Sequence, residues 1–104
     1  MARIAFKMQL LPGQEAEYKK RHDEIWPELS VLLKHSGVSE YSIFLDDETN
    51  GLFGFLKVED QEQLDSLPAQ IIMQKWWAYM SDIMETNLDS SPVSIPLKEV
   101  FYLP

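Results

Sequence analysis

The chain has 104 residues, a net charge of −8 and no cysteine. This length suits one domain with a single core, so we expect residues 1–104 to form one unit. So short a chain has little bulk to enclose a deep cavity, and we expect an open groove or a site completed by a second subunit. Only nine Lys and Arg residues are present, which disfavours binding to nucleic acid or to anionic membranes. The absence of cysteine excludes disulfides, thiolate metal sites and a cysteine nucleophile.

The start of the sequence does not resemble a signal peptide. Lys7 follows Arg3 before any long apolar run begins. No stretch of the sequence has the apolar length needed to span a bilayer. We therefore expect a cytoplasmic protein.

The first third of the chain predicts a strand and then a helix. Apolar residues at alternate positions over 4–10 indicate a half-buried strand. Over residues 14–35 the period becomes helical. Pro27 falls within this pattern, and because it has no N–H to offer the Asp23 carbonyl, it predicts a kink or break. One helix face carries Tyr18, His22, Ile25, Trp26, Leu29, Leu32 and Leu33.

The middle of the chain predicts a hairpin. Alternating residues over 41–45 indicate a second strand, and residues 52–58 indicate a third. Asn50-Gly51 between them is a strong hairpin turn signal. The third strand is apolar on both faces: Phe53 and Phe55 lie on one, and Leu52, Leu56 and Val58 lie on the other.

The last third predicts a helix, a loop and a strand. A helical turn is expected within residues 60–67, and a second main helix over 69–84. Residues 87–96, rich in Ser, Asp and Pro, predict a loop. Residues 97–103 alternate again and predict the final strand.

This order of elements, β-α-β-β-α-β, is that of an α+β ferredoxin-like fold, an antiparallel sheet with both helices on one face. The strands are apolar on both faces, but the helices can cover only one. An uncovered apolar sheet face indicates an interaction surface or a ligand site. We expect two copies to pack their sheets face to face, forming a homodimer.

His22 is the first candidate for chemistry. Its side chain lies on the inward helix face, one turn after Tyr18, and an imidazole suits proton transfer near neutral pH. A lone histidine on an apolar face is usually a core residue with both nitrogens satisfied. Here the face becomes more polar toward its N-terminus, as expected of a helix that seals the core at one end and lines a wet cavity at the other. The residues alone leave both interpretations open.

The adjacent tryptophans Trp76 and Trp77 are the second candidate. Indole faces can pack on the C–H face of a sugar ring, and indole N–H groups can bind its hydroxyls. Trp and Met at helical spacing are nevertheless more often core residues. Tyr41, at the start of the second strand, can present its hydroxyl at the sheet edge. No glycine-rich phosphate loop, His-x-x-x-His pair or Gly-x-Ser-x-Gly motif is present.

Three segments of the chain resemble one family. The segment from Tyr18 to Leu29 contains R-H-x-x-I-W-P-E-L, residues 74–80 contain Q-x-W-W-x-Y-M, and the chain ends in E-V-F-Y-L-P. Together with Tyr41, these segments resemble L-rhamnose mutarotase along the whole chain. The resemblance implies a cytoplasmic homodimer of the dimeric α+β barrel type. It also implies an isomerase that interconverts the α and β anomers of L-rhamnose in rhamnose catabolism, without metal or organic cofactor.

The resemblance also implies roles for particular residues. His22 would be the proton donor, and Tyr18, Tyr41, Trp76 and Trp77 would bind the sugar. Mutarotation suits these residue types, because an acid protonates the ring oxygen while a base removes the proton of the anomeric hydroxyl. The base is left open between Tyr18, another group of the same network and water. The alternatives are a cofactor-free dimeric-barrel monooxygenase and a non-catalytic ligand-binding domain.

Overall fold

The structure is a computed structural model that describes residues 2–104. It contains four strands, four α-helices and one short 3₁₀ helix in the part of the chain it describes. In chain order the elements are β1 (Ala2–Gln9), α1 (Glu15–Asp23), α2 (Pro27–His35), β2 (Val38–Asp46), β3 (Gly51–Val58), α3 (Gln61–Asp65), η1 (Leu67–Ala69), α4 (Ile71–Met80) and β4 (Ile95–Leu97).

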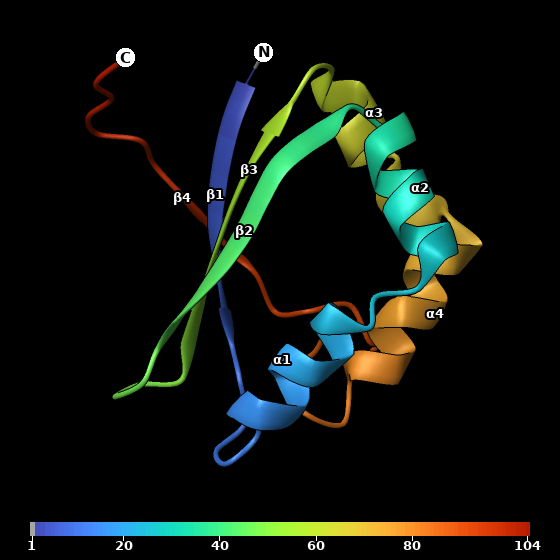
Figure 1. Ribbon diagram of the computed structural model, residues 1–104, viewed down its shortest axis with the longest axis vertical. Helices are drawn as coiled ribbons and strands as arrows, with labels where there is room; N and C mark the ends of the chain where they lie inside the picture. The colour runs from blue at the N-terminus through green and yellow to red at the C-terminus, as the bar shows by residue number, and fades with distance from the viewer. Residues whose placement is uncertain (1) are drawn as a thin grey trace.

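The four strands form one antiparallel sheet in the order β2-β3-β1-β4. The helices lie on one face of this sheet, and the opposite face is not covered by helices (Figure 1). This is the ferredoxin-like α+β arrangement that the sequence predicts. No helix among residues 2–104 is long and apolar enough to cross a membrane.

The first helix is broken at Pro27, as predicted. α1 ends at Asp23, and Pro27 is the first residue of α2, where its missing N–H costs nothing. Trp26, with an extended backbone, provides the carbonyl that accepts hydrogen bonds from the N–H groups of Leu29 and Ser30. The break lets α1 take a direction different from that of α2 (Figure 1).

The predicted hairpin joins β2 and β3. Asn50 has a φ of 62°, the left-handed conformation that such turns require. β2 also contains an irregularity between Ser39 and Ser42, where Glu40 adopts a φ of 48°. A bulge of this kind bends the strand and changes the direction of neighbouring side chains. The carboxylate of Glu40 forms an ion pair with Lys57 of β3, at 2.7 Å.

The predicted bounds of the last helix and the last strand are wrong, and the last strand begins within the loop predicted over 87–96. The second main helix covers 71–80 rather than 69–84, because extended Gln70 separates it from η1 and a turn ends it after Met80. The final strand covers only 95–97 rather than 97–103. β4 runs antiparallel to β1, with Leu97 opposite Ala5. After Leu97 the chain turns away from β1 (Figure 1), so residues 98–100 do not pair although β1 continues to Ala2.

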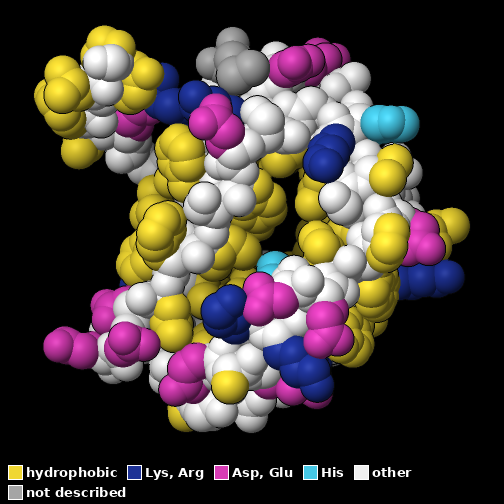
Figure 2. Space-filling model, viewed as in Figure 1, with side chains coloured by type: hydrophobic (Ala, Val, Ile, Leu, Met, Phe, Trp, Pro, Cys, Tyr) yellow, Lys and Arg dark blue, Asp and Glu magenta, His cyan; other side chains and the backbone are white. Residues whose placement is uncertain are grey.

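The outer sheet face is apolar and crossed by two rows of residues. Register places Phe44, Phe53, Lys7 and Ile95 in one row, and Ser42, Phe55, Ala5 and Leu97 in the other. Phe44 is 68% exposed. The C-terminal tail, residues 98–104, carries further exposed apolar side chains, which gather at the upper left of Figure 2. Hydrogen bonding between Arg3 and Glu99 ties this tail to β1.

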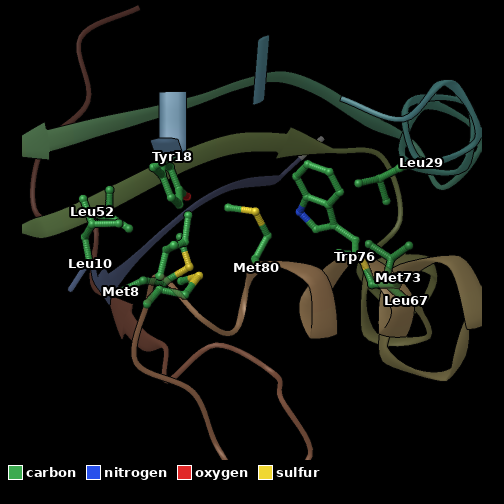
Figure 3. Packing of buried hydrophobic residues seen from close by; sticks show 11 residues of the cluster. Met8, Leu10, Tyr18, Leu29, Leu52, Leu67, Met73, Trp76 and Met80 are labelled. Carbon is green, nitrogen blue, oxygen red and sulfur yellow. The ribbon is translucent and has the colours of Figure 1, made fainter. Parts of the chain in front are cut away.

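The core lies between the inner sheet face and the helices (Figure 3). Leu52, Leu56 and Val58 of β3 are buried there, on the face predicted for them, whereas Phe53 and Phe55 point to the outer face. The larger buried cluster consists of Met8, Leu10, Tyr18, Leu29, Leu52, Leu67, Met73, Trp76, Met80, Ile83 and Met84.

Gly54 tests how closely the inner sheet face is packed. It lies opposite Phe6 in the β1–β3 register, and a Cβ at Gly54 would overlap the Phe6 ring, with Cε2 only 2.6 Å away. We predict that Gly54→Ala lowers the free energy of unfolding by about 1–3 kcal/mol, the usual cost of overpacking. Urea unfolding of the four proteins in a double-mutant cycle with Phe6→Ala measures this cost. In the Phe6→Ala background the same change is expected to cost less, and equal costs in both backgrounds would contradict the account.

Candidate active site

A cavity of about 1010 Å³ lies between the inner sheet face and the helices. Figure 2 shows this hollow, with hydrophobic side chains around it. Most of the wall is apolar, with the few polar groups typical of a small-molecule site. Strands β1, β2 and β3 contribute Ile4, Phe6, Met8, Tyr41, Ile43, Leu45, Leu52 and Leu56 to the lining.

His22 lines the cavity from the last turn of α1. Its Nδ1 lies 3.0 Å from the carbonyl oxygen of Tyr18, one turn earlier in the same helix. A carbonyl oxygen only accepts hydrogen bonds, so Nδ1 carries the proton in this contact. The other ring nitrogen, Nε2, is therefore the one left to exchange a proton with a ligand.

Burial lowers the pKa of His22, since the charged imidazolium is poorly solvated there. The hydrogen bond to Tyr18 and the nearby charge of Asp23 act in the opposite direction but are the smaller effects. The imidazole is consequently neutral at pH 7 in the unliganded protein. In this state Nε2 has a free lone pair and accepts a proton.

Two tyrosines accompany His22 in the cavity wall. Tyr18 is buried, and its ring centroid lies 4.4 Å from that of His22. Burial raises the pKa of Tyr18, and the neighbouring Tyr41 raises it further. Burial also raises the pKa of Tyr41, to about 12. Both hydroxyls therefore stay protonated at neutral pH and can donate hydrogen bonds to a ligand.

Tyr41 is oriented by the sheet. It follows Glu40, the left-handed residue of the β2 irregularity, and its ring packs edge-on against Phe6, with centroids 6.2 Å apart. Phe6 in turn covers Gly54. The position of Tyr41 thus depends on the close packing of β1 on β3.

The two tryptophans of α4 lie in different surroundings. Trp76 is 5% exposed and belongs to the core, yet its indole meets the His22 ring edge-on, with centroids 5.4 Å apart. Trp77 is only half-buried. It lines both the main cavity and a smaller adjoining space of about 390 Å³, which Pro68, Gln74, Asp89 and Ser91 also border. Trp76 is therefore both a core residue and part of the site.

The structure brings together every site residue proposed from the sequence. Tyr18, His22, Tyr41, Trp76 and Trp77 all line the main cavity. Sequence reasoning missed the wall formed by β1 and β2, although the alternating apolar residues of β1 were a usable signal for it. Among residues 2–104, no group of three or more His, Asp or Glu side chains lies together in a way that could hold a metal ion.

The fold and the cavity together define a class: a small ferredoxin-like protein with an apolar cavity that holds one titratable histidine among protonated tyrosines and tryptophans. Comparison with known proteins identifies the family. The L-rhamnose mutarotase family model matches residues 3–103. This chain belongs to the L-rhamnose mutarotase family, whose members are isomerases that interconvert the anomers of L-rhamnose.

Several relatives support this assignment over the full length of the chain. The L-rhamnose mutarotase of Bacteroides thetaiotaomicron is 60% identical over 103 residues, covering 99% of each chain. That of Formosa agariphila is 58% identical over 103 residues, also covering 99% of each. The crystal structure of a Formosa agariphila L-rhamnose mutarotase, 57% identical, superposes with a TM-score of 0.94 and covers 100% of both chains.

A more distant neighbour shares the fold alone. A solved structure from Mycobacterium tuberculosis has a TM-score of 0.57 at 9% identity, covering 98% of this chain and 97% of its own. The relatives favour neither the monooxygenase nor the non-catalytic domain that the sequence left as alternatives.

Titration of His22 tests the electrostatics of the site. Because the pKa of His22 is lower in the folded chain than its usual 6.5, we predict that its NMR titration midpoint lies below 6.5. The folded protein then binds this proton less strongly than the unfolded chain does. The free energy of unfolding should therefore fall as the pH drops below 6.5 and through the folded pKa.

The Hε1 resonance of His22, followed against pH, measures the midpoint. Only two histidines are present, so His22→Gln assigns both signals. The same variant should show a weaker loss of stability at acidic pH. A midpoint at or above 6.5 would show that burial does not dominate the pKa of His22.

Proposed function

We propose that His22 is the proton-transfer group of the mutarotase reaction, with the sugar bound in the main cavity. In ring opening, the protonated Nε2 gives its proton to the ring oxygen as the bond from that oxygen to C1 breaks. In ring closure, the neutral Nε2 takes the proton back from the C5 hydroxyl. The observation that carries this proposal is the hydrogen bond from Nδ1 to the Tyr18 carbonyl, which leaves Nε2 for the sugar.

The lowered pKa of His22 suits such a two-way exchange. An imidazolium with a lowered pKa is a stronger acid, and its neutral form is regenerated readily at pH 7. The proton must move in both directions in every turnover, because ring opening takes it from Nε2 and ring closure returns it.

Tyr18 and Tyr41 are assigned to binding sugar hydroxyls. The raised pKa values of both phenols make them hydrogen-bond donors and acceptors and poor general bases. The proton of the anomeric hydroxyl therefore goes to water in this proposal. As it leaves, C1 becomes the aldehyde carbon of the open chain. Rotation about C1–C2 then presents the other face of the carbonyl for closure.

The tryptophans and the apolar wall are assigned to the sugar's C–H surfaces. Trp77 is half-buried at the cavity wall, where an indole face can pack against a pyranose ring. Trp76 lies against His22 and limits where the ring oxygen can sit. The apolar side chains of β1 and β2 suit the methyl group of a 6-deoxy sugar.

Anomer exchange measured by NMR saturation transfer tests the role of His22. We predict that the wild-type protein accelerates exchange between the anomeric protons of α- and β-L-rhamnose. His22→Ala should lower the catalysed rate by about 10²–10⁴-fold, the usual contribution of a general acid or base. Circular dichroism should show that the variant stays folded.

His35→Ala is the matched control, because His35 is the only other histidine and is exposed at the end of α2. It should keep the wild-type rate. A folded His22→Ala protein with full activity would refute the proposed role. An insoluble variant would instead favour a core histidine.

The outer sheet face is assigned to a homodimer. The faces of two sheets, each with its apolar rows of Phe44, Phe53, Phe55, Ile95 and Leu97, would pack together as in a dimeric α+β barrel. The C-terminal tail, residues 98–104, follows the edge strand β4 and carries exposed apolar side chains, which would add to this interface. We also place the enzyme in the cytoplasm, in keeping with a role in rhamnose catabolism.

Light scattering after gel filtration tests the dimer. The wild-type protein should elute with twice the 12.1 kDa mass of one chain. Phe44→Asp, which places a charge on the outer face, should shift it toward the monomer. Ile71→Asp is a matched control, because Ile71 is also 68% exposed but lies on α4. A monomeric wild-type protein, or a Phe44→Asp variant that stays dimeric, would contradict the proposal.

A further inference from the structure

Arg21 lies next to His22 in α1, and most of its side chain is covered by neighbouring residues. Only 11% of the side chain is exposed. Its Nε donates a hydrogen bond to Glu17 one turn earlier, at 2.8 Å. Its Nη1 and Nη2 donate to the two oxygens of Asp82, at 2.8 and 3.2 Å, and Nη1 also donates to the Tyr79 carbonyl, at 2.8 Å. Arg21 thus joins α1 to the C-terminal end of α4.

This connection matters because α1 has little else to hold it. Tyr18 is the only buried residue of α1. The helix is separated from α2 by the break before Pro27, and it stands apart from the sheet beside the end of α4 (Figure 1). The bidentate contact between Arg21 and Asp82 fixes both distance and orientation, as a guanidinium–carboxylate pair does. The placement of His22, the next residue, depends on it.

A second path runs from Arg21 to His22 through aromatic rings. The guanidinium lies 4.4 Å from the centroid of the Tyr79 ring. The Tyr79 ring lies 5.7 Å from that of Trp76, and Trp76 meets His22 edge-on at 5.4 Å. The same cation therefore supports both the helix that carries His22 and the indole against which His22 packs.

The charges of Arg21 and Asp82 keep the ion pair between them intact near neutral pH. The hydrogen bond to Asp82 raises the pKa of Arg21, and the bond to Arg21 lowers the pKa of Asp82. Neither group changes its charge near neutral pH. The contact therefore persists near neutral pH.

We propose that Arg21, held by Asp82, is a positioning residue that sets the place of His22 against Trp76 and the sugar's ring oxygen. This inference rests on the proposed role of His22. A loss of position affects the chemical step more than substrate binding, because the reacting atoms must meet within hydrogen-bond reach. Arg21 itself exchanges no proton with the sugar.

Anomer exchange measured at a series of L-rhamnose concentrations tests the proposal. Arg21→Met should lower kcat by roughly 10- to 100-fold, the scale of a misplaced reacting group, and leave KM within about 2-fold of the wild-type value. Arg21→Lys should recover only part of kcat, since an ammonium keeps the charge but not the two-pronged contact. The His22 Hε1 resonance should shift in Arg21→Met, reporting its altered contact with Trp76.

Two further variants keep the test decisive. Asp82→Asn leaves Arg21 in place and should lower kcat in the same direction, which covers the case in which Arg21→Met does not fold. Lys20→Met is the matched control, because it removes a positive charge from the exposed residue preceding Arg21, and it should keep the wild-type kcat. Folded Arg21→Met or Asp82→Asn protein with wild-type kcat would overturn the proposal.

Failure of the positioning role differs from failure of the proposed function. If His22→Ala keeps full activity, the role of His22 is wrong and this inference falls with it. If His22→Ala is inactive while the Arg21 and Asp82 variants are fully active, only the positioning role is wrong. A loss of stability with an unchanged kcat would show that Arg21 serves folding alone.

Discussion

The break at Pro27 is the constraint on which the site depends. A proline has no N–H for the carbonyl four residues earlier, and its ring would collide with that carbonyl. The helical segment predicted over 14–35 is therefore two helices, α1 and α2, whose inward faces line different parts of the molecule. α2 places Leu29 in the core at 1% exposure, while α1 stands away from the sheet and carries Tyr18 and His22. The space between α1 and the sheet is the cavity.

The wall of the cavity is mostly apolar and contains a few polar groups. Burial shifts the pKa values of three of them, His22, Tyr18 and Tyr41. Burial disfavours the charged forms of His22, Tyr18 and Tyr41, which lowers the pKa of the imidazole and raises those of the two phenols, so His22 is neutral and both phenols are protonated at pH 7. A ligand therefore meets hydrogen-bond partners and one imidazole nitrogen, with no fixed charge on these three groups. A neutral sugar suits this environment, because opening and closing its ring requires only proton transfers from the surrounding groups while the bond between C1 and the ring oxygen breaks and re-forms. The uncatalysed reaction already proceeds in water, so one or two positioned groups, each contributing about 10²–10⁴-fold, would suffice for catalysis.

Much of the fold could be predicted from the sequence because the signals were local, and the five residues proposed for the site line one cavity. Alternation predicted the strands, Pro27 the helix break, and Asn50-Gly51 the hairpin. Tyr18 and His22, one turn apart, necessarily share a helix face. The resemblance of the motifs to L-rhamnose mutarotase favours a catalytic His22 over a core histidine, a choice that periodicity alone leaves open and that the proposed experiments test.

Other features depend on contacts between distant parts of the chain. The Arg21–Asp82 ion pair joins residues 61 positions apart, and no pattern in the sequence predicts a contact at that separation. The early end of β4 depends on where the chain turns away from β1, after Leu97, and the size of the cavity depends on how far α1 stands from the sheet. The irregularity of β2 at Glu40, just before Tyr41, could not be predicted either, because the residues around it show no sequence feature typical of a bulge.

The central claim, that His22 exchanges a proton with the ring oxygen of a sugar held in the main cavity, can be tested in a crystal structure. The complex would contain 1,5-anhydro-L-rhamnitol, which has the ring oxygen but no anomeric hydroxyl and cannot open. The account predicts the ring oxygen within about 2.6–3.2 Å of Nε2, with the sugar between the sheet and Trp77. A sugar bound elsewhere, or turned so that Nε2 faces no ring oxygen, would contradict it.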